Sequence, residues 1–326
     1  MAAMTAAPNA AIHAAQIDGH GRLRHLLSLD GLPRPMLERL LDRAQALVDD
    51  ARGGTAMRHV LAGKAVCTLF FEPSTRTRSS FALAAQRLGA DLLSFDATTS
   101  STTKGEADID TLKTLEAMGV HAFVVRHKRD GAVAELAAAA EPGTVLLNAG
   151  DGRSNHPTQG LLDMLTLRQA KGADFSRLKV AIVGDVKHSR VARSDLHALR
   201  ALGCGEIRVC GPANLLPDDG TLAGCVVTDD LDAALDGVDA AMMLRLQRER
   251  MAEGLVASLE DYHRDYGLTA QRLRRAAADA IVMHPGPMNR GVEISDEVAD
   301  GPQSRVLRQV ANGVAVRMAV LEALLA

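Results

Sequence analysis

Short apolar runs alternate with segments of helical periodicity through the first half of the chain. The run AVCTLFF at residues 65–71 is typical of a buried strand, and similar runs follow at residues 91–95, 122–126 and 144–150. Helical spacing of apolar residues occurs over residues 35–51, from the STRTR turn at residues 74–78 to about Gly89, and over residues 108–119 and 131–140. Residues 96–106 are polar and lack periodicity, which predicts a loop.

The alternation restarts after a polar turn at residues 151–155, where we expect a hinge or domain boundary. Expected strands cover residues 179–185, 206–212, 240–245 and 281–283, and expected helices cover residues 156–172, 189–203, 231–237, 269–280 and 302–325. Short apolar strands that alternate with helices form parallel sheets covered on both faces. The pattern therefore predicts the α/β class, with two doubly wound domains, each a parallel sheet flanked by helices.

Composition narrows the classes of function. The chain has 326 residues, a formal net charge of −3 and 2% aromatic residues, so it lacks the basic surface and the aromatic platforms of nucleic-acid binding. Its four cysteines, Cys67, Cys204, Cys210 and Cys225, form no Cys-x-x-Cys pair and are expected to be free thiols in a reducing compartment. The eleven histidines show no metal-ligand spacing, and no metal site is expected.

No membrane-targeting feature is apparent. Residues 1–18 are rich in alanine and lack a basic segment followed by a continuous apolar core, so we expect a disordered or frayed tail and not a signal peptide. No apolar run reaches the length of a membrane span.

The turn after the first expected strand collects hydrogen-bond donors. Residues 74–78 read STRTR, so three hydroxyl groups and two guanidinium groups stand where a strand gives way to a helix. The first turn of a helix presents unpaired N–H groups and partial positive charge, which attract anions. One Ser or Thr before a helix is an ordinary N-cap. This set of donors exceeds what a cap requires and predicts an oxyanion or phosphate cradle.

Five further polar clusters stand at or just after the carboxyl ends of expected strands. They occupy residues 126–127, 156–159, 187–190, 245–247 and 284–287. Any one of them would more often be a surface charge or a cap. In open parallel sheets, however, ligands bind outside the carboxyl ends of the strands. We therefore expect one site in a cleft between the two domains.

Seven motifs carry a resemblance to a known family. In chain order they read FFEPSTRTRSSF, TTSSTTKGE, VVRH, HPTQGLLD, VGDVKHSRVARS, MMLRLQRERM and HPGPMNRGVEI, from about residue 70 to 294. Together they resemble the catalytic chains of the aspartate carbamoyltransferase family. The resemblance implies transfer of the carbamoyl group of carbamoyl phosphate to the amine of L-aspartate, giving N-carbamoyl-L-aspartate and phosphate, in de novo pyrimidine (UMP) biosynthesis. It also implies a cytoplasmic homotrimer with active sites between neighbouring chains, and no metal or organic cofactor.

The resemblance assigns carbamoyl phosphate to one set of residues. The implied ligands of the phosphate are Ser74, Thr75, Arg76 and Thr77. Those of the carbonyl oxygen are Thr77, Arg126 and His156, and Gln159 is implied to hold the carbamoyl amino group. Ser100 and Lys104 match residues that the family lends to the neighbouring subunit's site. The implied catalytic set is Arg76, Thr77, Lys104, Arg126 and His156. Arg78 lies beyond the matched phosphate ligands, where a structural pairing is expected.

A second set is implied for L-aspartate, which brings two carboxylates. Arg190 and Arg245 match two aspartate-binding arginines, with Gln247 and Lys104 as further contacts. A guanidinium fork suits a carboxylate because two parallel hydrogen bonds fix orientation as well as charge. Pro285 and Gly286 match main-chain carbonyl positions that meet the reacting groups.

The resemblance also implies domain roles and shows two departures. Residues 19–155 correspond to a carbamoyl-phosphate-binding domain, residues 156–301 to an aspartate-binding domain, and residues 302–326 to a C-terminal helix that packs back on the first domain. Asp195 stands where the family often has Asn, and Gly286 where some members have Leu. We expect Asp195 to act on packing or charge more than on the chemistry.

Three other interpretations compete with this one. A sister carbamoyltransferase acting on ornithine or an N-acylated ornithine would share the cradle, but HPGP at residues 284–287 and Arg245-x-Gln247 suit a carboxylate better. An oxidoreductase is disfavoured because no Gly-x-Gly-x-x-Gly turn follows Gly184. A catalytically inactive scaffold homologue predicts losses among the site residues, and none is lost. Regulatory or dihydroorotase-like chains are further candidate partners; no nucleic-acid or membrane partner is expected.

Overall fold

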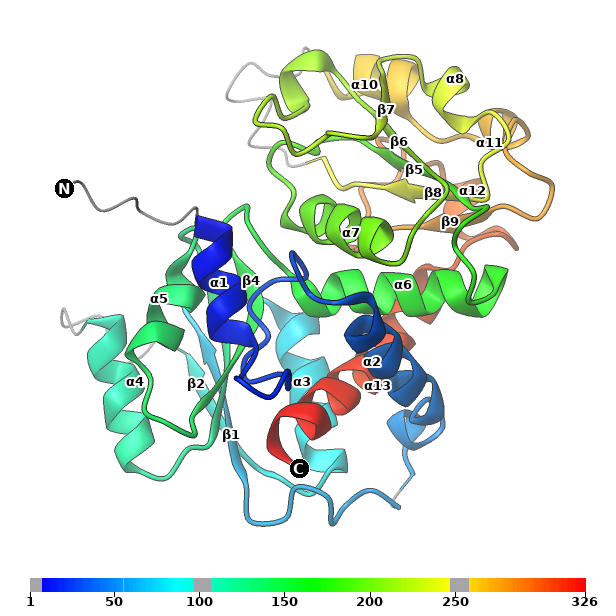
Figure 1. Ribbon diagram of the computed structural model, residues 1–326. Coiled ribbons are helices and arrows are strands. Elements are labelled where there is room, and N and C mark those ends of the chain that lie inside the picture. The colour runs from blue at the N-terminus through cyan, green and yellow to red at the C-terminus, as the bar shows by residue number, and fades with distance from the viewer. Residues whose placement is uncertain (1–7, 55, 97–106, 247–257) are drawn as a thin grey trace, which may run out of the picture. The chain divides into compact units, whose positions relative to one another are not determined.

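The computed structural model describes residues 8–54, 56–96, 107–246 and 258–326 (Figure 1). The chain divides into two compact units: unit 1 comprises Met1–Leu162 and Ala311–Ala326, and unit 2 comprises Asp163–Val310. The two divisions fall inside helices α6 (Pro157–Lys171) and α13 (Val306–Leu325), whereas the sequence places them after residues 155 and 301. Each helix therefore contributes residues to both units.

Unit 1 is built around a four-stranded sheet in which every pairing is parallel, in the order β2-β1-β3-β4. The strands are β1 (Ala65–Phe70), β2 (Asp91–Asp96), β3 (Ala122–His127) and β4 (Val145–Asp151). The helices are α1 (Pro8–Gln16), α2 (Arg34–Ala46), α3 (Thr75–Arg87), α4 (Asp108–Ala117) and α5 (Ala132–Ala139), with a 3-10 turn, η1, at Asp50–Arg52.

The strands of unit 1 bury side chains on both faces. Cys67 and Leu69 of β1 pack with residues of β3, α4 and α5 in one apolar cluster. Val66, Thr68 and Phe70 alternate with them on the opposite face and are fully buried. Figure 1 shows α4 and α5 on one side of this sheet and α3 on the other. Burial on both faces explains the continuous apolar run in the sequence.

Unit 2 is built around a five-stranded sheet, also parallel throughout, in the order β7-β6-β5-β8-β9. The strands are β5 (Lys179–Val183), β6 (Glu206–Cys210), β7 (Val226–Thr228), β8 (Ala240–Met243) and β9 (Ile281–Met283). The helices are α7 (Arg190–Ala201), α8 (Leu231–Leu235), α10 (Leu259–Tyr266), α11 (Ala270–Leu273) and α12 (Asp296–Ala299), with a 3-10 turn, η3, at Ala213–Leu215.

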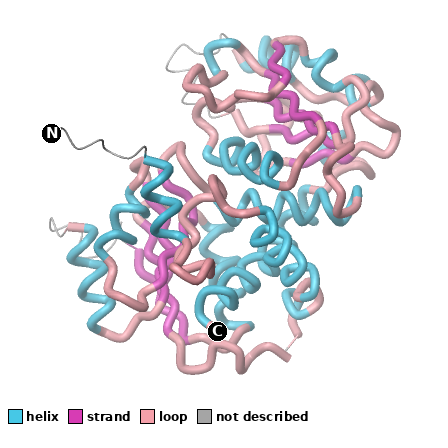
Figure 2. The backbone as a smooth tube through the Cα atoms, viewed as in Figure 1, coloured by secondary structure: helices cyan, strands magenta, loops and turns pink. Residues whose placement is uncertain are grey.

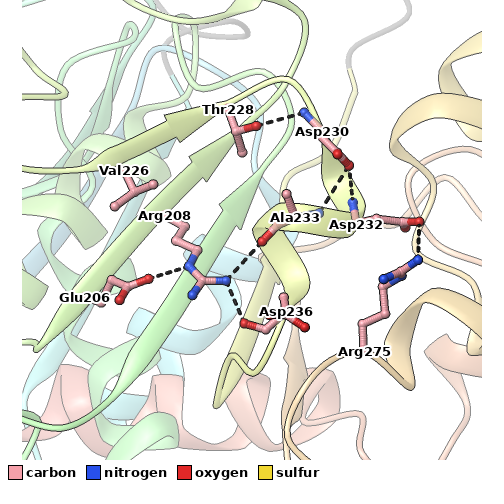
Figure 3. A pocket seen from close by; sticks show the side chains of 9 residues that line it. All are labelled: Glu206, Arg208, Val226, Thr228, Asp230, Asp232, Ala233, Asp236 and Arg275. Carbon is pink, nitrogen blue, oxygen red and sulfur yellow. Dashed lines mark hydrogen bonds and ion pairs between the residues drawn. The ribbon is translucent and has the colours of Figure 1, made fainter.

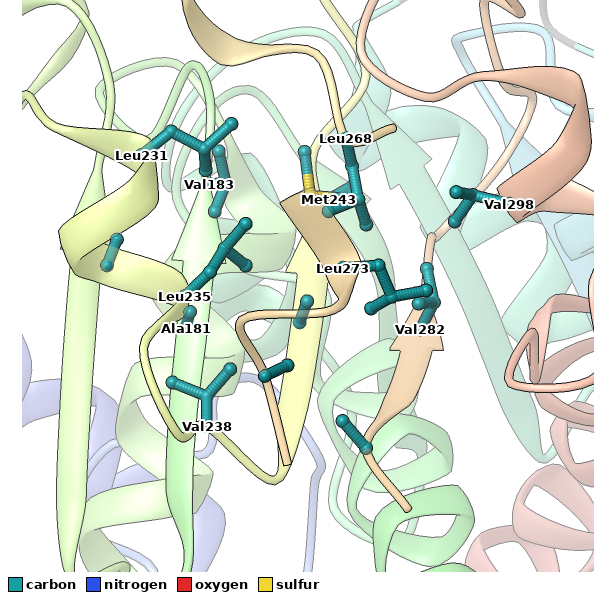
Figure 4. Close-up of a cluster of buried hydrophobic side chains, with 14 of the residues drawn as sticks. Ala181, Val183, Leu231, Leu235, Val238, Met243, Leu268, Leu273, Val282 and Val298 are labelled. Carbon is teal, nitrogen blue, oxygen red and sulfur yellow. The ribbon is translucent and has the colours of Figure 1, made fainter. Parts of the chain in front are cut away.

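One face of the second sheet forms an apolar cluster of buried residues (Figure 4). Val183, Met243 and Val282 from three neighbouring strands meet Leu235 of α8 and Leu273 of α11, and all are buried. In each unit, taken by itself, helices flank the strands (Figure 2). The predicted class, two doubly wound α/β domains, is confirmed.

Each sheet reverses its winding once. In unit 1 the chain runs from β1 outward to β2 and then continues on the other side of β1 with β3 and β4. In unit 2 it runs from β5 through β6 to β7 and then returns to β8 beside β5. Such reversals leave a crevice at the carboxyl ends of the two strands involved, which is where open α/β sheets bind ligands.

Two segments differ from the expectation. Residues from Pro8 onward form α1 where a tail is expected, and the buried Gln16 at its end accepts hydrogen bonds through Oε1 from Leu27 N and Ser28 N, at 2.7 and 2.8 Å. The helix expected over residues 269–280 ends at Leu273, because Gly237 N donates to Arg275 O and Ala277 N donates to Val238 O. The loop expected at residues 96–106 lies almost wholly outside the described residues. In the described parts of the chain, no helix combines the length and hydropathy needed to cross a membrane.

We expect Gly89→Ala to destabilise unit 1 far more than Gly119→Ala. Both glycines have positive φ, +82° and +88°, so each substitution carries a strain of about 1–2 kcal/mol. A Cβ on Gly89 would also overlap Arg58 O, 1.7 Å away, whereas none of the described atoms lies within 4 Å of a Cβ on Gly119. Urea unfolding should show an extra loss of about 1–3 kcal/mol for Gly89→Ala. Equal losses for the two variants would contradict this account of the turn that ends α3.

Candidate functional site

The STRTR turn lies at the amino end of α3, directly after β1. Ser74 is the N-cap residue with extended backbone, and its hydroxyl makes no capping hydrogen bond to the helix. The first-turn N–H groups and the positive end of the helix dipole are therefore not taken up by the Ser74 side chain. Thr77 is buried, whereas Thr75 and Arg76 are exposed. The turn thus offers main-chain and side-chain donors together.

The last residues of this segment have structural contacts. The Arg78 guanidinium carbon lies 5.0 Å from the centroid of the Phe70 ring, a cation–π contact. Ser80 Oγ donates to Arg76 O at 2.8 Å and to Thr77 O at 3.0 Å, within the helix. These contacts fix the first turn of α3 on the end of β1.

Arg126 lies beside the turn because β3 pairs with β1, with Phe70 opposite Arg126. The Arg126 side chain is 10% exposed. Its Nη2 lies 3.0 Å from Glu72 Oε1 and its Nη1 donates to Ala149 O at 3.2 Å. Phe71 N donates to Arg126 O at 2.8 Å, which holds the backbone on both sides. The guanidinium is therefore held in one place at the carboxyl edge of the sheet.

The neighbouring His127 has a structural arrangement. Its Nδ1 accepts a hydrogen bond from Arg129 N at 2.9 Å, so the ring proton is on Nε2, which lies 3.2 Å from Asp108 Oδ2. The ring packs against Phe71, with centroids 5.1 Å apart.

His156 and Gln159 come from the start of α6, next to the end of β4. Both side chains are buried, and Gln159 N donates to His156 O at 2.9 Å. Asp151 organises the turn before them: its Oδ1 accepts from Asn148 Nδ2 and Asn155 N, and its Oδ2 accepts from Gly131 N. Burial raises the pKa of Asp151 above its ordinary value. His156 and Gln159 thus follow the carboxyl end of β4, the strand that pairs with Arg126's strand, β3.

In unit 2, Arg190 begins α7 after the turn that follows β5. Ser189 caps the helix, its Oγ accepting from Ala192 N at 3.1 Å. The buried Asp185 accepts from His188 N at 3.2 Å through the same Oδ1 that contacts His188 Nδ1 at 2.8 Å. The turn is thus closed by its own side chains, and Arg190 remains partly exposed at the helix start.

Arg245 lies at the end of the neighbouring strand, β8, and its side chain is exposed. Leu246 beside it is buried, and its carbonyl accepts from Asn289 Nδ2 at 2.7 Å. The side chain of Arg245 can therefore reach a ligand while its backbone neighbour is fixed. Gln247, expected to act with Arg245, lies outside the described residues.

The turn that carries Pro285 and Gly286 follows β9 and is supported by a buried His–Glu pair. His284 Nδ1 accepts from Gly286 N at 2.8 Å, and His284 Nε2 lies 3.0 Å from Glu293 Oε1. Both side chains are fully buried. Glu293 also accepts from Asn289 N at 2.6 Å. Gly286 has φ +61°, a conformation that favours glycine.

The structure brings the candidates together in two groups, one at each sheet reversal. In unit 1 they gather at the carboxyl ends of β1, β3 and β4: Ser74, Thr75, Arg76, Thr77, Arg126, His156 and Gln159. In unit 2 they gather at the carboxyl ends of β5, β8 and β9: Arg190, Arg245, Pro285 and Gly286. Ser100 and Lys104 lie outside the described residues. Among the residues that are described, no three His, Cys, Asp or Glu side chains are placed to hold a metal ion.

A hollow of about 830 Å³ in unit 2 contains none of these candidates (Figure 3). Its polar lining is paired internally. Arg208 donates to Glu206 and to the carbonyls of Ala233 and Asp236 at the end of α8, and Asp230 Oδ1 caps the start of α8. These groups stabilise α8 on the sheet edge, and the hollow is not the candidate site.

Comparison with known proteins agrees with this geometry. Residues 24–169 match the family model for the aspartate/ornithine carbamoyltransferase carbamoyl-P binding domain, and residues 176–324 match the model for its Asp/Orn binding domain. The chain belongs to the aspartate/ornithine carbamoyltransferase family.

Within the family, the relatives compared include catalytic subunits of aspartate carbamoyltransferase. The chain is 76% identical to that of Xanthomonas axonopodis pv. citri over 310 residues, 95% of this chain and 98% of the relative. It is also 76% identical to that of Stenotrophomonas maltophilia over 313 residues, 96% of this chain and 99% of the relative. The resemblance predicted from the seven motifs is confirmed.

Solved structures show the same fold. Aspartate transcarbamoylase from Trypanosoma cruzi, in complex with carbamoyl phosphate and aspartate, superposes with a TM-score of 0.82 at 33% identity, covering 93% of this chain and 97% of that one. Ornithine carbamoyltransferase from Thermus thermophilus superposes with a TM-score of 0.81 at 29% identity, covering 93% and 99%.

Sequence reasoning gave no role to three carboxylates that support the site. Glu72 contacts Arg126, Asp185 closes the turn before Arg190, and Glu293 holds His284. All three stand inside the quoted motifs. For Glu72 and Asp185, a carboxylate directly after an apolar strand is a usable signal, because a charge there requires a partner.

We expect Glu293→Leu to destabilise unit 2 far more than Glu293→Gln. Leucine would leave the donors of His284 and Asn289 buried without an acceptor, at a cost of about 2–5 kcal/mol. Glutamine keeps an acceptor oxygen at the same place and should cost about 1 kcal/mol. Denaturant unfolding of the two variants measures the difference. Similar stability of both would show that the His284–Glu293 contact does not hold this turn.

Proposed function

We infer that the chain is an aspartate carbamoyltransferase, which transfers the carbamoyl group of carbamoyl phosphate to the amine of L-aspartate. The observation that carries this is the pair of donor groups at the two sheet reversals. One combines a helix amino end with hydroxyl groups and a buried arginine, which suits an acyl phosphate. The other presents two arginines, which suit a dicarboxylate. The 76% identity to aspartate carbamoyltransferase catalytic subunits supports the same activity.

In this proposal the turn at residues 74–77 binds the phosphate of carbamoyl phosphate. The N–H groups of α3's first turn, the helix dipole and Arg76 stabilise the charge that grows on the leaving phosphate. Thr77, Arg126 and His156 donate to the carbonyl oxygen, and Gln159 holds the carbamoyl amino group. One donor aimed at a developing oxyanion contributes about 3–4 kcal/mol.

The acceptor amine is the nucleophile, so no nucleophilic side chain is required. Arg190, Arg245 and Gln247 bind the two carboxylates of L-aspartate, and the carbonyls of Pro285 and Gly286 meet the reacting groups. The amine nitrogen bonds to the carbonyl carbon, and the bond from that carbon to the phosphate oxygen breaks. The amine loses one proton, which the departing phosphate accepts.

Further parts of the proposal concern assembly and setting. The chain forms a homotrimer in which Ser100 and Lys104 of one subunit complete the site of the next. The product enters pyrimidine (UMP) synthesis, and the enzyme acts in the cytoplasm. All four cysteines are free, which supports a reducing compartment.

The direct test offers three acceptors with carbamoyl phosphate: L-aspartate, L-ornithine and N-acetyl-L-ornithine. We expect phosphate and carbamoylated product with L-aspartate alone, because two arginines face the acceptor. Turnover only with an ornithine compound would retain the cradle and overturn the roles of Arg190, Arg245 and Gln247. A folded trimer inactive with every acceptor would favour the scaffold interpretation.

Shared sites make a second prediction about mixed assemblies. Lys104→Ala and Arg76→Ala should each lose most activity, about 100-fold or more, because each removes a charge from the phosphate. Mixing the two chains after reversible dissociation should restore part of the activity, since one hybrid site regains both residues. Remixing each variant with itself is the control. Absence of recovery in trimers proven to be mixed would exclude the sharing of Lys104.

A further inference from the structure

Asp195 lies on α7, five residues after Arg190, and is fully buried. Neither of its side-chain oxygens accepts a hydrogen bond from an N–H or hydroxyl donor in the described part of the chain. A buried carboxylate without donors is costly, and such a group retains its proton instead. Burial, and then the nearby Asp163, raise the pKa of Asp195 well above its ordinary value.

The ionisable group that acts on Asp195 is the second fully buried carboxyl, Asp163 of α6, which lies within side-chain hydrogen-bonding reach. Two carboxyl groups can form a hydrogen bond only if one of them is protonated. Asp163 Oδ1 also accepts from Gln309 Nε2 of α13 at 2.7 Å. Gln309 Oε1 in turn accepts from His284 N at 2.9 Å. A continuous polar chain therefore leads from α7 to the turn after β9.

We propose that Asp163 and Asp195 share one proton at neutral pH, and that this acid pair positions Arg190 relative to the Pro285–Gly286 turn. The first half of the proposal concerns the folded chain alone. The second half rests on the proposed function, in which Arg190 and this turn bind L-aspartate. Asp195 is thus a positioning residue that does not touch substrate.

Arg193 and Arg200, two arginines of α7, have partners other than the acid pair. On α7 itself, Arg193 contacts Asp219 and Thr221, and Arg200 donates to the carbonyls of Thr221 and Ala223. From α13 the pair receives the neutral amide of Gln309. Asp163 is the ionisable group that acts on Asp195.

The shared proton has a defined effect on stability. The unfolded Asp195 ionises at about pH 3.9, whereas the folded pair keeps its proton to higher pH. Between these two values the folded state binds one proton more than the unfolded chain, so stability falls as pH rises. Asp195→Asn supplies an N–H donor to Asp163 without that proton. Its stability relative to wild type should therefore increase with pH, by up to about tenfold in the folding equilibrium constant per pH unit.

Urea unfolding from pH 4.5 to 8.5 tests the pair on wild type, Asp195→Asn, Asp163→Asn and the double asparagine variant. The slope of the unfolding free energy against pH gives the number of protons released on unfolding. This number should fall by one in each single variant, and it should fall no further in the double variant. Identical pH dependence of wild type and Asp195→Asn would overturn the proposal. Loss of two protons in the double variant would show separate protonation and would also overturn it.

Steady-state kinetics test the positioning role. Asp195→Asn should keep the KM for L-aspartate within about twofold of wild type, whereas Asp195→Leu, which cannot bond Asp163, should raise it about tenfold with little change in the KM for carbamoyl phosphate. The wild-type KM for L-aspartate should also rise at alkaline pH, and that of Asp195→Asn should not. A Leu variant with wild-type kinetics would overturn the role. Failure of the proposed function would instead remove all turnover and leave the unfolding result intact.

Discussion

Parallel strand pairing is the constraint on which the rest of this structure depends. When all strands of a sheet run the same way, every carboxyl end lies on one edge, and the loops that leave that edge must meet there. In both units the winding reverses next to the first strand, between β1 and β3 and between β5 and β8. The STRTR turn and Arg126 stand at one reversal, and Arg190 and Arg245 at the other. Residues far apart in the sequence thus become neighbours through sheet order.

The sequence predicts most of the individual strands and helices, but not every helix end or side-chain partner. The strand AVCTLFF is readable because burial on both faces gives a continuous apolar run, and α3 and α7 are readable because their apolar residues recur at helical spacing. Helix α11 is shorter than its pattern because the backbone at Arg275 and Ala277 bonds to another turn. The spacing of apolar residues in the sequence does not reveal such competition between local and distant hydrogen bonds. Motifs identified the candidate residues, but not their supporting partners.

Exposed and buried charges have different roles in this structure: exposed arginines are available to substrate, and buried carboxylates hold the turns that carry them. Arg190 and Arg245, which are proposed to bind substrate, are partly exposed and exposed, whereas Asp185 and Glu293 behind the binding turns are buried and accept several hydrogen bonds each. A buried carboxylate that is fully satisfied fixes the atoms around it, because moving any donor leaves the charge unpaired. The arginines can therefore remain accessible without losing orientation. Only their three-dimensional partners reveal this, since the sequence does not state which carboxylate meets which turn.

The acid pair of Asp163 and Asp195 is also buried and supports a binding turn, but it depends on a retained proton and not on a full set of donors. Asp185 and Glu293 are held as acceptors by several donors, but Asp195 has Asp163 as its partner, so its stability depends on a retained proton. Such a contact is stable only while the pair carries a single charge, because two buried like charges repel. Asp163 also joins α6 to α13 through Gln309, close to where both helices pass from one unit to the other. A change in the charge of this pair therefore acts where α6, α7 and α13 are joined, and along the hydrogen-bonded chain that ends at His284.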